Sequence, residues 1–222
     1  MIRLSSLFRI FFYLLVLYGY SISHAGSYDD FFNAIQRDES DTVTALLKRG
    51  FDVNTLNPTG ESGLMQAIRA ESMKVTAVLL KSPQVVVETR SREDESPLML
   101  AALKGLTDVC QQLVIQGADV NKPGWTPLHY AATHGHMAAM RLLIDNYAYI
   151  DAASPNGSTP IMMAAHYGTP LAVQLLLEAG ADPLLKNVQG MNAIDFAQRA
   201  DRPTVAELIA AFVRSRQPKG SW

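Results

Sequence analysis

The 222-residue sequence predicts an all-α solenoid of about six stacked helical repeats, in which the first and last repeats act as caps. Three observations predict this fold class. A short motif recurs along the chain with a period of about 33 residues. Each copy is followed by a pair of bulky aliphatic residues at a similar distance. Proline or glycine stands at many of the positions where a helix is expected to begin or end.

The recurring motif begins with a hydroxyl residue and a proline and ends with two alanines. The clearest copies are 96–102 (SPLMLAA), 126–132 (TPLHYAA) and 159–165 (TPIMMAA). Weaker copies begin at Asp29, Ser62 and Asn192, so the successive spacings are 33, 34, 30, 33 and 33 residues. A single shared period indicates one structural unit that occurs six times.

Each repeat is expected to hold two antiparallel helices. The Ser or Thr that opens the motif can accept a hydrogen bond from a free N–H group, and the proline after it needs no N–H partner. Gly105, Gly135 and Gly168 mark the turn between the helices, and the second helix carries the aliphatic pair, such as Leu142–Leu143. Glycine then ends several of the second helices. A polar segment follows, which we expect to form a β-hairpin-like finger.

Two departures from the period predict local differences. Three finger residues are missing before Trp125, so we expect a stunted finger and a notch between the third and fourth repeats. The fourth repeat has Asn146 and Tyr147 where other repeats have a helix-ending glycine. We expect Asn146 to adopt the positive φ there, because a tyrosine would be strained in that conformation.

The pattern resembles the ankyrin repeat over essentially the whole chain after residue 25, most closely at 126–136 (TPLHYAATHGH). The resemblance implies helix-turn-helix repeats with hairpin fingers, and a concave face that binds another protein. The expected repeats are 27–56, 57–89, 90–121, 122–153, 154–186 and 187–213. They form one domain, 26–213, and residues 214–222 are predicted to be a frayed tail.

The first 25 residues have the order of charges and apolar residues that is typical of a secretory signal peptide. Arg3 and Arg9 precede an apolar run at 10–18, and the small residues Ser23 and Ala25 follow it. We therefore predict cleavage between Ala25 and Gly26, and export without further attachment to the membrane. The low cysteine count and the single compact domain favour a Gram-negative periplasm, and a eukaryotic secretory route is the other destination consistent with the sequence. The alternative is a retained membrane anchor, for which the run is short, since a bilayer span needs about 20 residues.

Composition and motifs exclude several classes of function. The net charge of −2 argues against a nucleic-acid-binding protein. Cys110 is the single cysteine, so an internal disulfide or a cysteine-based zinc cluster cannot form, and we expect this thiol to be buried. The sequence has no phosphate-binding loop, nucleophile elbow or zinc-protease motif. We therefore predict a monomeric, non-catalytic protein that needs no cofactor or metal.

The predicted protein-binding residues follow from the resemblance, which places the variable positions of the first helices on the concave face. With Trp125 from the stunted finger, the set is Leu100, Leu103, Lys104, Trp125, Tyr130, Thr133, His134, Met163, His166 and Tyr167. A second predicted contact set lies on a charged finger and comprises Arg90, Arg92, Glu93 and Asp94. Aromatic residues and Met are enriched in interface cores, which favours an as yet unidentified protein as the partner.

The histidines carry one open alternative. The resemblance implies that His129 makes a structural hydrogen bond between adjacent repeats. His134 and His166, together with His136, could instead form a metal site in a ligand-binding groove. The simpler interpretation is that these side chains are polar residues on the groove surface.

Overall fold

A computed structural model describes residues 26–216, which fall into two compact units divided between Val85 and Val86. Within the described residues the regular structure is helical, apart from one isolated antiparallel bridge between Leu56 and Ser62. The predicted all-α helical repeat class is therefore confirmed. The predicted signal peptide and cleavage site involve residues 1–25, which lie outside the described range. None of the described helices is both long and apolar enough to cross a membrane.

The first unit contains two pairs of helices. They are helical residues 26–36 with α2 (Ser40–Lys48), and α3 (Gly63–Arg69) with α4 (Met73–Leu80). Phe31 is fully buried, and its ring centroid lies 4.7 Å from that of Phe51. Gly63 stands where later repeats have proline, and a Cβ atom there would lie 2.6 Å from the Phe31 ring. The large phenylalanine therefore takes the space that a proline ring fills in other repeats.

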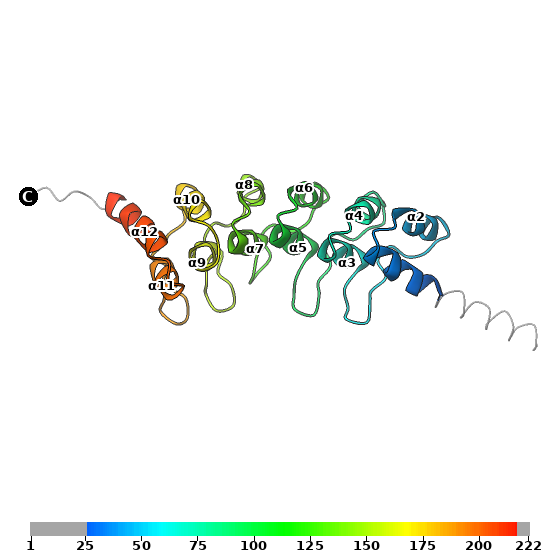
Figure 1. The fold of residues 1–222 in the computed structure, drawn as a ribbon, viewed down its shortest axis with the longest axis horizontal. Coiled ribbons are helices and arrows are strands. Elements are labelled where there is room, and N and C mark those ends of the chain that lie inside the picture. The colour runs from blue at the N-terminus through cyan, green and yellow to red at the C-terminus, as the bar shows by residue number, and fades with distance from the viewer. Residues whose placement is uncertain (1–25, 217–222) are drawn as a thin grey trace, which may run out of the picture. The chain divides into compact units, whose positions relative to one another are not determined.

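The second unit contains four pairs of helices. They are α5 (Pro97–Lys104) with α6 (Thr107–Ile115), α7 (Pro127–His134) with α8 (Met137–Asp145), α9 (Pro160–His166) with α10 (Pro170–Glu178), and α11 (Ala193–Arg199) with α12 (Pro203–Arg216). Within this unit, α5, α7 and α9 form one layer and α6, α8 and α10 the other (Figure 1). The loops between repeats extend from the layer of first helices (Figure 1). Successive first helices pack directly on one another.

The predicted start of the first helix is confirmed at all three of the clearest motif copies, and the predicted hydroxyl cap at two of them, since the Thr159 hydroxyl has no hydrogen-bond partner among the described residues. The Ser96 hydroxyl accepts a hydrogen bond from the N–H of Met99 at 3.2 Å, and Thr126 accepts one from His129 at 3.5 Å. In both cases a proline occupies the first helical turn. The cap and the proline therefore fix where α5 and α7 begin, and with them the register of the face that these helices present.

The turn after α8 differs from the prediction, because Tyr147 and not Asn146 adopts the left-handed conformation. The φ angle is 63° at Tyr147 and −100° at Asn146. The N–H groups of Tyr147 and Ala148 bond to the carbonyls of Ile144 and Leu143, as those of Gly117 and Ala118 bond to the carbonyls of Val114 and Leu113 in α6. This shared hydrogen-bond pattern imposes the left-handed conformation on whichever residue takes the glycine position.

Replacing Tyr147 by glycine is expected to raise the free energy of unfolding by about 0.5–1 kcal/mol. A left-handed conformation costs an L-residue about 1–2 kcal/mol, and glycine regains most of that at some cost in chain entropy. The Tyr147 side chain is 85% exposed, so its removal loses little packing. Urea unfolding measures the change. Tyr149→Gly is the control, because Tyr149 is exposed but has no positive φ angle, so this variant should be less stable than the unaltered protein. Stabilisation of both variants would contradict the explanation.

The last helix, α12, continues to Arg216, three residues beyond Val213, where the predicted domain ends. The Arg214 guanidinium pairs with the carboxylate of Glu207, and the Arg216 guanidinium lies 4.4 Å from the centroid of the Phe212 ring. These contacts continue the helix through residues that the sequence pattern assigned to a frayed tail. The remaining tail residues, 217–222, lie outside the described range.

Candidate functional site

The candidate site is the surface of the second unit formed by α5, α7, α9 and α11 with the loops before them, here called the first-helix face. It carries most of the predicted binding residues at its surface. Exposed side chains are Lys104, His134 and Tyr167, and half-buried ones are Leu103, Trp125, Tyr130, Thr133, Met163 and His166. Tyr167 is 61% exposed, which makes it the most accessible aromatic residue of the set.

Leu100 is a correction to the predicted set. Its side chain is only 2% exposed, so it cannot contact a partner protein. Every residue from Pro97 to Ala102 is buried, and the apolar surface of α5 therefore extends further around the helix than the repeat pattern predicted. Leu100 belongs to the core.

Tyr130 and Trp125 are held in place by contacts within the unit. The Tyr130 hydroxyl donates a hydrogen bond to Glu95 at 3.1 Å, and the Trp125 ring packs edge-on against His129 with 5.2 Å between centroids. The Thr133 hydroxyl donates to the carbonyl of His129 at 2.8 Å, which gives it a role within the helix. Tyr130 and Trp125 thus present fixed surfaces, and fixed side chains lose little entropy on binding.

The charged finger is partly tied down by ion pairs. The Arg90 guanidinium pairs with Glu88 and lies 3.9 Å from the Asp94 carboxylate. Arg92 and Glu93 are exposed, whereas Arg90 is half-buried. Of the four predicted finger residues, Arg90 and Asp94 form ion pairs that stabilise the finger, and Arg92, Glu93 and Asp94 are exposed.

The stunted finger is present, and it holds a buried lysine that sequence reasoning missed. The loop before α7 runs from 116 to 126, three residues shorter than the loop from 146 to 159 before α9, and it is visibly the shorter in Figure 1. Lys122 is 4% exposed. Its ammonium group pairs with Asp94 of the preceding finger and donates to the carbonyls of Pro123 and Trp125 at 2.9 and 3.3 Å. Lys122 therefore links the short finger to the preceding one. The sequence could not predict its burial, because a charged residue in a polar loop is normally exposed.

His129 makes the predicted hydrogen bond between adjacent repeats. Its Nε2 lies 2.9 Å from the carbonyl oxygen of Ser158, so Nε2 carries the hydrogen and donates. Nδ1 then accepts from the N–H and hydroxyl of Thr126, at 3.2 and 2.8 Å. Burial lowers the pKa of His129 to about 4, with a smaller contribution from the charge of Lys122. The imidazole is neutral at pH 7 and has a structural role.

Cys110 is fully buried, as predicted from its position in the second helix. Burial raises the pKa of its thiol to about 12, because the thiolate would lose its hydration. A protonated, inaccessible thiol is a poor nucleophile. Cys110 therefore contributes to packing in α6 and not to chemistry on the first-helix face.

A cavity of about 260 Å³ lies between the last two repeats and includes two of the predicted residues, His166 and Tyr167. The other lining residues are Asn156, Asn187, Gln189, Met191, Phe196 and Arg199. Phe196 and Arg199 occupy in α11 the same motif offsets that Tyr130 and Thr133 occupy in α7. The repeat pattern could have identified them, but the prediction ended at the fifth repeat.

The alternative metal site is not supported by the side-chain contacts. The His134 ring stacks on His136 with 5.7 Å between centroids, and Nε2 of His136 lies 2.9 Å from the Leu103 carbonyl. His166 directs Nδ1 to the Phe196 carbonyl at 3.1 Å. In residues 26–216, no three His, Cys, Asp or Glu side chains lie close enough together to hold a metal ion.

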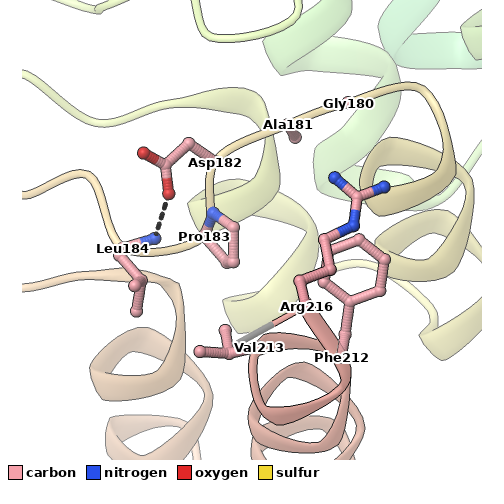
Figure 2. Close-up of a pocket in the computed structure, with 8 residues that line it drawn as sticks. All are labelled: Gly180, Ala181, Asp182, Pro183, Leu184, Phe212, Val213 and Arg216. Carbon is pink, nitrogen blue, oxygen red and sulfur yellow. Dashed lines mark hydrogen bonds between the residues drawn. The ribbon is translucent and has the colours of Figure 1, made fainter. Parts of the chain in front are cut away.

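A second cavity, of about 350 Å³, lies where the extended end of α12 passes the turn after α10. Figure 2 shows its lining residues, which are mostly small or apolar: Gly180, Ala181, Asp182, Pro183, Leu184, Phe212, Val213 and Arg216. The Asp182 carboxylate accepts a hydrogen bond from the N–H of Leu184 at 2.9 Å (Figure 2). Three of its lining residues belong to α12, and none of them is a predicted binding residue.

Comparison with known proteins shows the family. The family description for ankyrin repeats in three copies matches residues 31–123 and 98–187, and the chain belongs to the ankyrin-repeat family. Mouse nuclear factor NF-kappa-B p105 subunit is 30% identical over 153 residues, which are 66% of this chain and 16% of that protein. Tyrosine-protein kinase Shark of Drosophila melanogaster is 30% identical over 175 residues, 77% of this chain and 19% of the kinase. The chain thus spans less than a fifth of the curated relatives it matches.

Two solved structures resemble this chain over nearly their whole length. One is a chain from the complex of the Bd0816 predatory endopeptidase of Bdellovibrio bacteriovorus with immunity protein Bd3460; it is 28% identical, with a TM-score of 0.72. The other is an ankyrin repeat domain from Acinetobacter baumannii, which is 24% identical with a TM-score of 0.71 and shows the fold alone. Each match covers 82% of this chain and 97% of the other. Ankyrin repeats are typically non-catalytic modules that bind other proteins.

Proposed function

We propose that this chain is an exported, non-catalytic protein that binds a partner protein through the first-helix face. The observation that carries the proposal is a row of large side chains at the same motif offset on consecutive first helices: Tyr130, Met163 and Phe196. Each is half-buried, and Tyr167, directly after α9, adds an exposed aromatic side chain. Aromatic anchors of this kind dominate the energy of many protein interfaces.

The comparisons support a protein as the ligand. Ankyrin repeats generally bind proteins, and the Bdellovibrio chain was solved in a complex of two proteins. Groups that would suggest catalysis on this face are accounted for, since His129 is neutral and hydrogen-bonded on both nitrogens and Cys110 is buried. Binding, rather than turnover, is therefore the function that the face supports best.

The double variant Tyr130→Ala and Tyr167→Ala is expected to abolish capture of the partner from a periplasmic extract. Removing an interface anchor costs about 2 kcal/mol or more, and two together should reduce binding by at least a hundredfold. The melting temperature should fall only slightly, because Tyr167 is largely exposed and Tyr130 half-buried. Capture followed by mass spectrometry, and circular dichroism, measure the two effects.

Tyr147→Ala with Tyr149→Ala is the matched control, since it removes two exposed tyrosines from the loop after α8. The control should capture the partner as the unaltered protein does. An unfolded Tyr130/Tyr167 variant would assign the two tyrosines to the core. A folded variant that still binds with unchanged affinity would place the interface elsewhere, with the finger at Arg92 and Glu93 the next surface to alter.

We further propose that residues 1–25 direct export to the periplasm and are removed after Ala25. The basic start, the apolar run at 10–18 and the small residues at Ser23 and Ala25 support this proposal. Intact mass of the protein from the soluble periplasmic fraction should correspond to a chain that begins at Gly26. A full-length chain found only in the membrane fraction would instead support the alternative, a membrane-tethered scaffold.

A further inference from the structure

Resting on the proposed function, we infer that the cavity between the last two repeats binds a carboxylate side chain, Asp or Glu, of the partner protein. Its lining includes two apolar side chains, Met191 and Phe196. It also includes three polar ones, Arg199, His166 and Tyr167. An acidic residue with an aliphatic neighbour matches both parts of this surface.

Arg199 is the central group, because its positive charge is not neutralised within the described residues. The guanidinium approaches the sulfur of Met191 at 3.8 Å and pairs with no carboxylate in residues 26–216. Asp195 lies one turn earlier on α11, but its carboxylate accepts the N–H of Asn192 at 2.8 Å as part of the helix cap. An exposed arginine of this kind can bind a carboxylate through two parallel hydrogen bonds.

The polar groups that shape the cavity are already hydrogen-bonded. The Asn187 side-chain oxygen accepts the N–H groups of Gln189 and Met191, both at 3.0 Å. The Asn156 carbonyl accepts the N–H of Val188 at 3.0 Å, which ties the two fingers together. The asparagines therefore fix the walls, and the side chains of Arg199 and Tyr167 are available to donate hydrogen bonds to a ligand.

His166 positions its neighbour Tyr167 and does not itself donate to the carboxylate. Nδ1 donates to the Phe196 carbonyl at 3.1 Å, so Nε2 of the neutral ring carries a lone pair and can only accept a hydrogen bond. The His166 ring packs edge-on against Tyr167 at 4.1 Å between centroids. This contact holds the tyrosine beside the cavity, where its hydroxyl is able to donate to an acidic group. Arg199 and Tyr167 thus both favour a ligand group that accepts hydrogen bonds, such as a carboxylate.

The test is selection of a random-peptide phage library on the purified protein, followed by affinity measurements with one selected synthetic peptide. We expect selected peptides to contain Asp or Glu beside an aliphatic residue. Replacing that acid by its amide in the peptide, or Arg199→Gln in the protein, should weaken binding about tenfold, as expected for a charge-assisted hydrogen bond. Arg199→Lys should retain part of the affinity, because lysine keeps the charge without the planar fork.

Arg141→Gln is the matched control, since Arg141 is an exposed arginine on α8 and should leave peptide binding unchanged. Selected peptides without an acidic residue, or equal binding by Arg199→Gln, would overturn the inference. If such peptides still depend on Tyr130 and Tyr167, the carboxylate assignment fails while binding by the first-helix face stands. Recovery of no peptide at all would also count against the cavity as a recognition site.

Discussion

Truncating Leu143 to alanine is expected to lower the free energy of unfolding by about 2–5 kcal/mol, the range for large-to-small changes in a packed core. Leu143 is fully buried in α8, and α8 packs against both α6 and α10. Its carbonyl also accepts the N–H of Ala148 at 2.9 Å in the turn that follows. A cavity at this position weakens the contact of the fourth repeat with both neighbouring repeats.

The neighbours matter because each repeat depends on them for its core. Repeat proteins gain stability from nearest-neighbour interfaces, so damage to a central repeat affects two interfaces at once. Urea unfolding followed by circular dichroism measures the loss. Ile115→Ala is the matched control, since Ile115 is 76% exposed at the end of α6, and surface changes usually stay within about 0.5 kcal/mol. Similar losses in the two variants would contradict the assignment of Leu143 to the core.

Acidification from pH 7 to pH 4 is expected to lower the free energy of unfolding through His129 by about 3 kcal/mol. The pKa of this residue is about 4 in the folded protein, against the ordinary value of 6.5. Between these values the unfolded chain binds a proton that the folded chain excludes, so stability falls as the pH falls. Each pKa unit corresponds to about 1.4 kcal/mol. The contribution is fully present above pH 6.5 and fully lost once the pH is below 4.

The geometry explains why the proton is excluded. Nε2 donates to Ser158 and Nδ1 accepts from Thr126, so protonating Nδ1 would place its hydrogen against the Thr126 N–H. His129→Gln should be less stable than the unaltered protein at pH 7, and the gap should narrow toward pH 4. His134→Gln is the control, because His134 is exposed and should leave the pH dependence intact. Unfolding curves at several pH values for both variants test this; an unchanged pH dependence in His129→Gln would refute it.

The fold could be predicted because the same motif, with the same helix-start and helix-end residues, occurs in several repeats. Caps at Ser96 and Thr126 and prolines at the following positions fix where helices start, and the structure places them as expected. At Tyr147 the conformational preference of the residue alone predicts the wrong position for the positive φ angle. The hydrogen-bond pattern of the turn is common to the repeats, and it overrides the preference of a single side chain.

The candidate site was less predictable, because exposure depends on how neighbouring helices and fingers pack. Tyr130 and Tyr167 lie at the surface as expected, whereas Leu100 is buried by the apolar surface of α5. Lys122 is buried through bonds to a residue of another finger, which no local pattern encodes. Arg199 occupies in the sixth repeat the motif position that Thr133 occupies in the fourth, so the repeat pattern extended by one repeat predicts it.

Site-specific photo-crosslinking in living cells tests most directly whether the first-helix face binds a protein. A photoreactive phenylalanine analogue is introduced at Tyr167, and in a separate variant at Ile115 in the layer of second helices. Irradiation should join one partner protein to the Tyr167 variant, and an acidic segment of it is expected near the site. The Ile115 variant should give no such product, although Ile115 is 76% exposed and Tyr167 61%. A product from Ile115 with none from Tyr167 would contradict the account.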